Sequence, residues 1–115
     1  MKSILITAIF LVIMISCAYD NEEDLYGSAE CPPEGVSYKE TIEPIIQANC
    51  AISGCHITGQ QSPVLQTYDQ IAANARGIRS QTSSGIMPPA TSGKKLSPNQ
   101  VNQIVCWIDA GSPEN

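Results

Sequence analysis

The stretch that decides how this chain folds is Cys50-Ala51-Ile52-Ser53-Gly54-Cys55-His56, where a histidine directly follows the second cysteine of a close pair. Two thiols at this spacing can serve two chemistries. They can close a disulfide loop that precedes an unrelated histidine, or they can hold a flat cofactor by two points on its edge. In the second case the spacer must loop outward, and Ser53 and Gly54 give it the flexibility to do so.

The cofactor that such a stretch typically holds is haem c. Thioether bonds from two cysteines attach the haem, and the histidine beside the second cysteine then ligates the iron. The usual run is Cys-x-x-Cys-His, so the four-residue spacer between Cys50 and Cys55 is a departure from it. In this interpretation His56 is the proximal iron ligand.

The second axial ligand is predicted to be Met87. Once residues 1–16 are removed, His56 is the chain's single histidine and Met87 its single methionine. A thioether is a soft ligand for iron, and Met/His ligation raises the reduction potential relative to two nitrogens. Pro88 and Pro89 restrict the backbone beside the sulfur, which favours a ligand over a methionine that merely fills a gap in the core.

The N-terminus is predicted to be a lipoprotein signal peptide over residues 1–16. The apolar run of residues 4–15 is too short for the ~20 residues of a spanning helix and matches a secretory signal; a short span or a buried helix is the alternative. Met14-Ile15-Ser16-Cys17 resembles the lipobox of bacterial lipoproteins, which makes Cys17 the lipidated residue. A plain signal peptidase could instead cut near Ser16 or Ala18.

The rest of the chain divides into a tether and one domain. Residues 17–35 are expected to be an acidic, lipid-anchored tether and lead-in segment, and residues 36–115 the folded domain. The acidic cluster at residues 20–24 is either a solvated tether or a surface-export signal. The net charge of −5 argues against nucleic-acid binding, which needs a basic face, and suits basic redox partners.

Apolar periodicity predicts two helices in the first part of the domain. One covers about residues 38–48 with Ser37 as its cap, and Pro44 either kinks it or begins a shorter helix. The other covers about residues 67–79, where Thr67 opens a capping box.

A third helix is predicted from Ser97, which caps it, to Gly111, which ends it. Pro98 takes its first position, and one apolar stripe follows: Val101, Ile104, Val105 and Ile108. No strand pattern is found. The long loops at residues 57–65 and 81–95 are expected to wrap a cofactor, because structureless connections of this length are otherwise uncommon.

The order of these features resembles a class I, monohaem cytochrome c domain, in particular that of small bacterial lipoproteins. Such proteins carry stretches similar to Thr41-Ile42-Glu43-Pro44-Ile45-Ile46 before the haem motif and to Trp107-Ile108-Asp109-Ala110-Gly111 at the end. The similarity covers about residues 36–112. It implies an all-α, cytochrome c-like fold of three or four short helices and long loops around one haem, with the first and last helices crossing.

The same resemblance implies which residues serve the haem: Cys50, Cys55, His56 and Met87. Trp107 is expected to lie near the haem, in the core, or both. The two remaining cysteines, Cys31 and Cys106, have no ligands nearby at the spacing of a zinc site. In an exported protein they suggest a disulfide, with two unpaired thiols as the alternative. Another scheme pairs Cys50 with Cys55 and leaves the iron out.

The sequence therefore predicts electron transfer through one haem rather than an enzyme, because His56 and Met87 would fill both axial positions. Redox proteins are the expected partners of a monomer, or of a module in a larger redox assembly. The expected location is the bacterial cell envelope, anchored by lipid to the outer membrane on its periplasmic or surface side. The alternatives are a haem-free, disulfide-stapled binding lipoprotein and a peroxidase-like enzyme in which Met87 leaves the iron.

Overall fold

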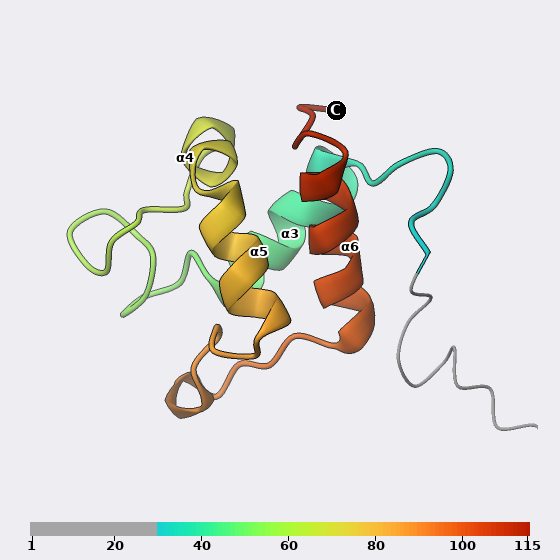
Figure 1. Ribbon diagram of the computed structural model, residues 1–115. Helices are drawn as coiled ribbons and strands as arrows, with labels where there is room; N and C mark the ends of the chain where they lie inside the picture. The colour runs from blue at the N-terminus through green and yellow to red at the C-terminus, as the bar shows by residue number, and fades with distance from the viewer. Residues whose placement is uncertain (1–29) are drawn as a thin grey trace, which may run out of the picture.

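The computed structural model describes residues 30–115, whose regular secondary structure is entirely helical (Figure 1). The all-α class predicted for the domain is thereby confirmed for this part of the chain. The signal peptide of residues 1–16, the lipidation site Cys17 and the acidic cluster of residues 20–24 lie outside the described residues. Within residues 30–115, no helix has the length and apolar character needed to cross a membrane. The elements are η1 (Tyr38–Ile42), α3 (Glu43–Asn49), α4 (Tyr68–Ala73), α5 (Ala75–Ser83), η2 (Ala90–Ser92) and α6 (Pro98–Asp109).

The first predicted helix is formed by η1 and α3, which follow each other without a gap. The Ser37 hydroxyl accepts the Glu40 backbone N–H at 3.2 Å and caps the segment, as expected. Pro44 lies in the first turn of α3, after a wider turn in which the Ile42 N–H donates to the Ser37 carbonyl at 3.2 Å. Proline has no N–H, so the wider turn just before Pro44 does not break a hydrogen bond that Pro44 would otherwise donate.

The second predicted helix is divided in two, which corrects the prediction of one helix over residues 67–79. The Thr67 capping box is confirmed, but α4 ends at Ala73 and α5 continues to Ser83. At the break, the Asn74 side-chain amide donates to the Gln70 carbonyl at 2.8 Å. This carbonyl would otherwise accept a backbone N–H from the next turn, so the side chain competes with the helix. Part of the loop predicted at residues 81–95 is therefore helical.

The last helix, α6, follows its local signals closely. Ser97 and Gln100 form the expected capping box, and Pro98 occupies the first turn. Gly111 adopts a positive φ of 94°, and the next residue donates its N–H to the Trp107 carbonyl at 3.0 Å, which closes the helix end. Ile104 and Trp107 are fully buried, whereas the other members of the predicted apolar stripe are partly buried.

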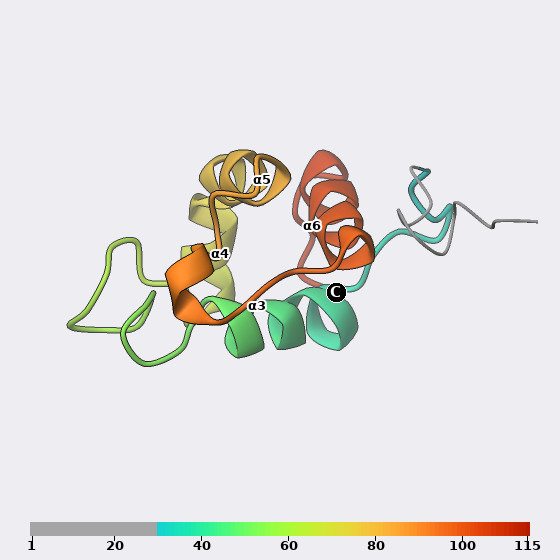
Figure 2. The ribbon, with the colours of Figure 1, turned by 90° about the horizontal axis from the view of Figure 1, so that it is seen from below.

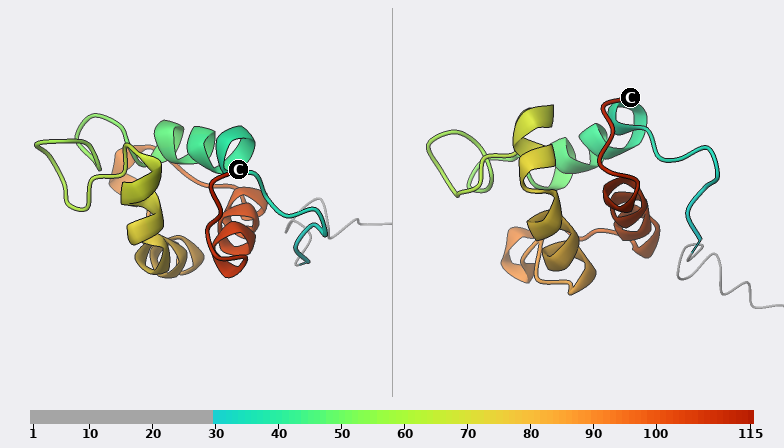
Figure 3. Two further views of the ribbon diagram at one scale, coloured as in Figure 1. Left: turned by 90° about the horizontal axis from the view of Figure 1, so that it is seen from above. Right: turned by 45° about the horizontal axis from the view of Figure 1, so that its top comes forward.

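The core lies where α6 crosses η1, and α5 packs alongside α6 (Figures 2 and 3). Tyr38 is its centre: its ring lies 5.1 Å from Tyr68, edge to face, and 5.7 Å from Trp107. The largest fully buried side chains are Trp107, Ile42, Ile46, Ile71 and Ile104.

A disulfide and a pair of hydrogen bonds hold the ends of the domain near this core. The predicted disulfide between Cys31 and Cys106 is confirmed, with a Cα–Cα distance of 5.4 Å, and it joins the lead-in segment to α6. Asn115 closes the start of η1: its side-chain oxygen accepts the Tyr38 N–H at 2.7 Å, and its backbone oxygen accepts the Lys39 N–H at 2.9 Å. Both contacts lie at the opposite end of the domain from the loop at residues 51–66 (Figure 2).

Candidate functional site

A cavity of about 610 Å³ lies between the end of α3, the loop that follows it, α5 and the loop after α5. Its volume is within the range of cofactor sites, which is ~300–1,000 Å³. The four predicted haem residues all line it: Cys50, Cys55, His56 and Met87. The fold thus brings Met87 to the same cavity as the Cys50–His56 stretch, although 31 positions separate Met87 from His56 in the sequence.

The His56 ring is oriented by a backbone oxygen. Its Nδ1 lies 2.7 Å from the Pro63 carbonyl oxygen. A carbonyl can only accept, so we assign the proton to Nδ1, which leaves the Nε2 lone pair free for a metal. The backbone of His56 is held as well: its N–H donates to the Cys50 carbonyl at 3.0 Å, and its carbonyl accepts the Leu65 N–H at 2.9 Å.

The four-residue spacer forms a turn at the surface. The Cys55 N–H donates to the Ile52 carbonyl at 2.9 Å, and Gly54 has a φ of 85°, which side chains disfavour. Ser53 and Gly54 are exposed, as an outward loop requires. The Gly54 N–H donates to the side-chain oxygen of Gln60, so the turn is held by the loop itself.

The two cysteines of the stretch are free thiols in different surroundings. Cys50 is 8% exposed, and burial raises the pKa of its thiol to about 11, with the charge of Cys55 adding to the shift. Cys55 is partly exposed at the cavity. The structure therefore bridges Cys31 with Cys106 and leaves Cys50 and Cys55 unbridged.

The Met87 loop is fastened to the end of α5. The Gln81 carbonyl accepts two N–H groups, from Ile86 and from Met87, each at 3.0 Å. This oxygen belongs to the last turn of α5, where carbonyls lack a partner within the helix. Pro88 and Pro89 continue along the cavity wall. These two hydrogen bonds hold the Met87 backbone beside the cavity.

The α5 wall of the cavity was not predicted. It comprises Asn74, Gly77, Ile78, Gln81 and Thr82, which recur at the spacing of one helical face. A search for apolar periodicity misses this face because four of its five residues are not apolar. The spacing of Asn74, Gly77 and Gln81 was the signal that could have revealed it.

Trp107, by contrast, does not line the cavity. It is fully buried in the core, and its Nε1–H donates to the Pro113 carbonyl at 2.9 Å. Of its two expected roles, the structure places it in the core.

The three residues of the motif do not converge on one point as the ligands of a small ion would. Within the described part of the chain, no three His, Cys, Asp or Glu side chains come together in a metal-binding group. Thioether attachment needs no such convergence, since the two sulfurs bond to the edge of the haem and only the histidine ligates the metal.

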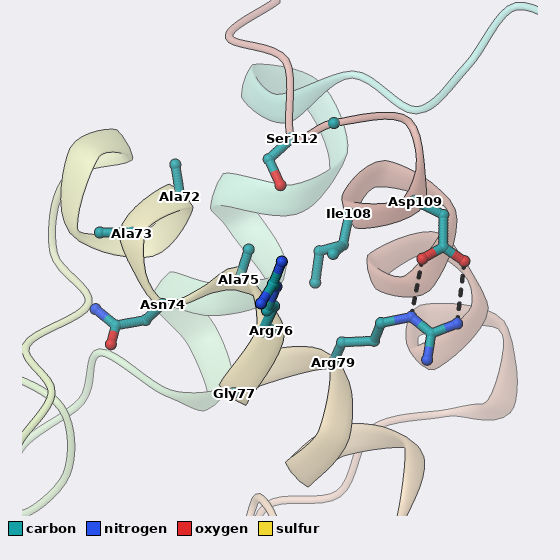
Figure 4. Close-up of a pocket in the computed structure, with 11 residues that line it drawn as sticks. Ala72, Ala73, Asn74, Ala75, Arg76, Gly77, Arg79, Ile108, Asp109 and Ser112 are labelled. Atoms are coloured by element: carbon teal, nitrogen blue, oxygen red, sulfur yellow. Dashed lines mark hydrogen bonds and ion pairs between the residues drawn. The ribbon is translucent and has the colours of Figure 1, made fainter.

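A second cleft of about 640 Å³ lies on the other side of α5, against the end of α6 (Figure 4). Arg79 crosses it and forms a paired contact with Asp109, with Nε 2.9 Å from Oδ1. Comparisons of the chain with protein-family models, with curated proteins and with solved structures found no match.

Proposed function

We propose that this chain is a c-type cytochrome that holds one haem in the 610 Å³ cavity and transfers single electrons. The observation that carries the proposal is that Cys50, Cys55, His56 and Met87 line one cavity. Haem c, when bound, supplies an iron that exchanges one electron between its ferric and ferrous states.

The chain's own residues have separable roles in this proposal. Cys50 and Cys55 would attach the haem edge through thioethers, since each thiol can add across one vinyl group. His56 would ligate the iron through Nε2, and the Pro63 carbonyl would keep the ring oriented. Met87 would be the second axial ligand, on a loop fixed to α5.

The state of the cysteines favours this function over a haem-free binding lipoprotein. That alternative uses the same four cysteines in two bridges. Cys31 and Cys106 are bridged, whereas Cys50 and Cys55 are free. In an exported protein, two neighbouring thiols that stay free of each other are best explained by another covalent partner.

We further propose that the protein is anchored by a lipid on Cys17 in the bacterial cell envelope and exchanges electrons with redox proteins. The lipobox-like stretch that ends at Cys17 supports the anchor. If both axial positions are filled, no position on the iron is open for a substrate, so we propose electron transfer rather than catalysis.

The deciding experiment is coexpression of the full-length chain with a cytochrome maturation system. We expect a haem that stays with the protein after acid-acetone extraction, and a Cys50→Ala/Cys55→Ala variant that loses it. A colourless protein in which Cys50 and Cys55 are bridged would overturn the proposal and support the binding lipoprotein.

The role of Met87 has its own test. Met87→Ala is expected to change the low-spin spectrum of the haem-loaded protein, whereas Ile86→Ala, its exposed neighbour, should leave the spectrum unchanged. An unaltered spectrum for Met87→Ala would remove Met87 from the iron. A high-spin spectrum of the wild type would instead favour the peroxidase-like alternative, in which one axial position is open.

A further inference from the structure

The residues that line the proposed haem cavity include no Asp, Glu, Lys or Arg. This neutrality extends along the chain. No such residue occurs between Glu43 and Asp69, a segment that contains the Cys50–His56 stretch, and none occurs between Arg79 and Lys94, which contains the Met87 loop. The loop at residues 51–66 is therefore uncharged over its whole length, and the loop at residues 84–97 is uncharged as far as Lys94, apart from the titratable groups of the site itself.

α5 keeps its charges on its other face. Gln81 and Thr82 face the cavity, whereas Arg76 and Arg79 line the second cleft (Figure 4). Arg79 is further neutralised there by its paired contact with Asp109. The helix thus presents amide, hydroxyl and apolar groups to the cavity and cations to the opposite side.

The acidic residues gather around the start of the domain. Burial raises the pKa of Tyr38, and the charges of Glu43 and Glu114 raise it further, which places both carboxylates near η1. The cavity borders the opposite end of α3, at Asn49 and Cys50. Within residues 30–115 the seven Asp and Glu and the five Lys and Arg give a net charge of −2, and none of these twelve residues lines the cavity.

One of the loops that border the cavity also exposes an apolar side chain. Ile86, directly before Met87, is 57% exposed and is the one large hydrophobic residue that is exposed in the described chain. Its backbone is fixed by the bond to the Gln81 carbonyl at 3.0 Å, so its position beside the Met87 loop is defined.

We propose that the mouth of this cavity is an uncharged docking face, and that the redox partner meets it with an uncharged, partly apolar face of its own. The inference rests on the proposed function. Removing charges from water opposes docking, and the cavity-lining residues of this face have none to remove. Small, transient interfaces suit electron transfer, and Ile86 supplies apolar area for one. We therefore expect that the net charge of −5 does not steer the redox partner to this face. By itself, that charge would attract a cationic partner.

The surface charge can be mapped by amide NMR with two redox-inert paramagnetic probes, hexaamminechromium(III) and hexacyanochromate(III). In the full-length, haem-loaded chain we expect the cation to broaden the amides near Glu40 and the anion those near Lys94. The amides of Gly54 and Met87 should remain sharp with both probes. Broadening at Gly54 by the cation equal to that near Glu40 would overturn the inference. The map needs no electron transfer, so it can be repeated on the haem-free chain if the proposed function fails.

A kinetic test uses hexacyanoferrate(III) and tris(phenanthroline)cobalt(III), each of which takes one electron from the ferrous protein. Both rates should change less than about twofold between ~100 and ~500 mM ionic strength, because exposed charges more than ~10 Å from the face are screened in this range. Ile86→Lys adds one charge beside the face. It should speed the anionic oxidant and slow the cationic one, each roughly two- to fivefold at ~100 mM ionic strength.

Glu40→Gln is the matched control, because it makes the same change in net charge on η1. It should leave both rates within about twofold of the wild type. If Glu40→Gln shifts the rates as much as Ile86→Lys, overall charge controls the approach and the inference is wrong.

Discussion

The haem-free chain should lose stability at alkaline pH because of Cys50. Burial is the main cause that raises the pKa of this thiol from its ordinary 9.0 to about 11. Between these two values the unfolded chain releases a proton that the folded chain keeps. The stability contributed by the neutral Cys50 thiol is therefore complete below pH 9.0 and is lost as the pH rises through about 11. Two pKa units at ~1.4 kcal/mol each make the loss about 2.7 kcal/mol.

Urea unfolding of the haem-free chain and of a Cys50→Ala variant, from about pH 8 to pH 11, would measure this loss. The free energy of unfolding of the wild type should fall more steeply, by up to ~1.4 kcal/mol per pH unit. The pKa of Tyr38 is also raised, but Tyr38 is present in both proteins, so its contribution cancels in the difference. In the haem-loaded protein the free energy of unfolding should fall with pH no more steeply than in Cys50→Ala, because a thioether sulfur does not ionise.

Equal slopes for the wild type and Cys50→Ala would refute the reasoning, since they would mean that the thiol is not desolvated in the cavity wall. An independent measurement is alkylation by iodoacetamide. Ionisation alone should make Cys50 react about 100-fold more slowly at neutral pH than a thiol of ordinary pKa.

Other parts of the structure give further expectations. A Cys31→Ala/Cys106→Ala variant should lose roughly 4.5 kcal/mol in urea unfolding, by the chain-entropy relation for a loop that spans 75 positions; a loss below about 1.5 kcal/mol would contradict it. Asn115→Ala removes an acceptor from the first turn of η1 and should cost about 1 kcal/mol, seen as a lower Tm. In ¹⁵N NMR of the haem-free chain, neutral His56 should carry its proton on Nδ1, and the Nε2 tautomer would contradict the bond to Pro63.

The helix ends were predictable wherever a few neighbouring residues determine them. Ser97 and Gly111 act through hydrogen bonds within one turn of the chain, and α6 begins and ends beside them. The break at Asn74 was not predicted, because residues there suit a helix equally well by propensity. Only the direction of the Asn74 side chain, which takes the Gln70 carbonyl, divides α4 from α5.

The candidate ligands were predictable because their chemistry is rare in this sequence, but the wall opposite them was not. A single histidine and a single methionine after residue 16 leave few choices for an iron site. The α5 wall depends on tertiary packing. Their residue types do not mark Gln81 and Thr82 as cavity residues, and only the packing of α5 places them in the same cavity as Cys50.

The long loop before α4 has side-chain hydrogen bonds of its own. The side-chain oxygen of Gln66 accepts both the N–H and the hydroxyl of Thr58, at 2.9 and 2.8 Å, and Gln60 accepts the Gly54 N–H. The core around Tyr38 lies between other elements and shares only its edge with the cavity, through residues such as Cys50. The loop is thus held by its own hydrogen bonds. Cys50, Leu65 and Ile78 belong to the core and also line the cavity, so a haem bound there would add contacts to the core.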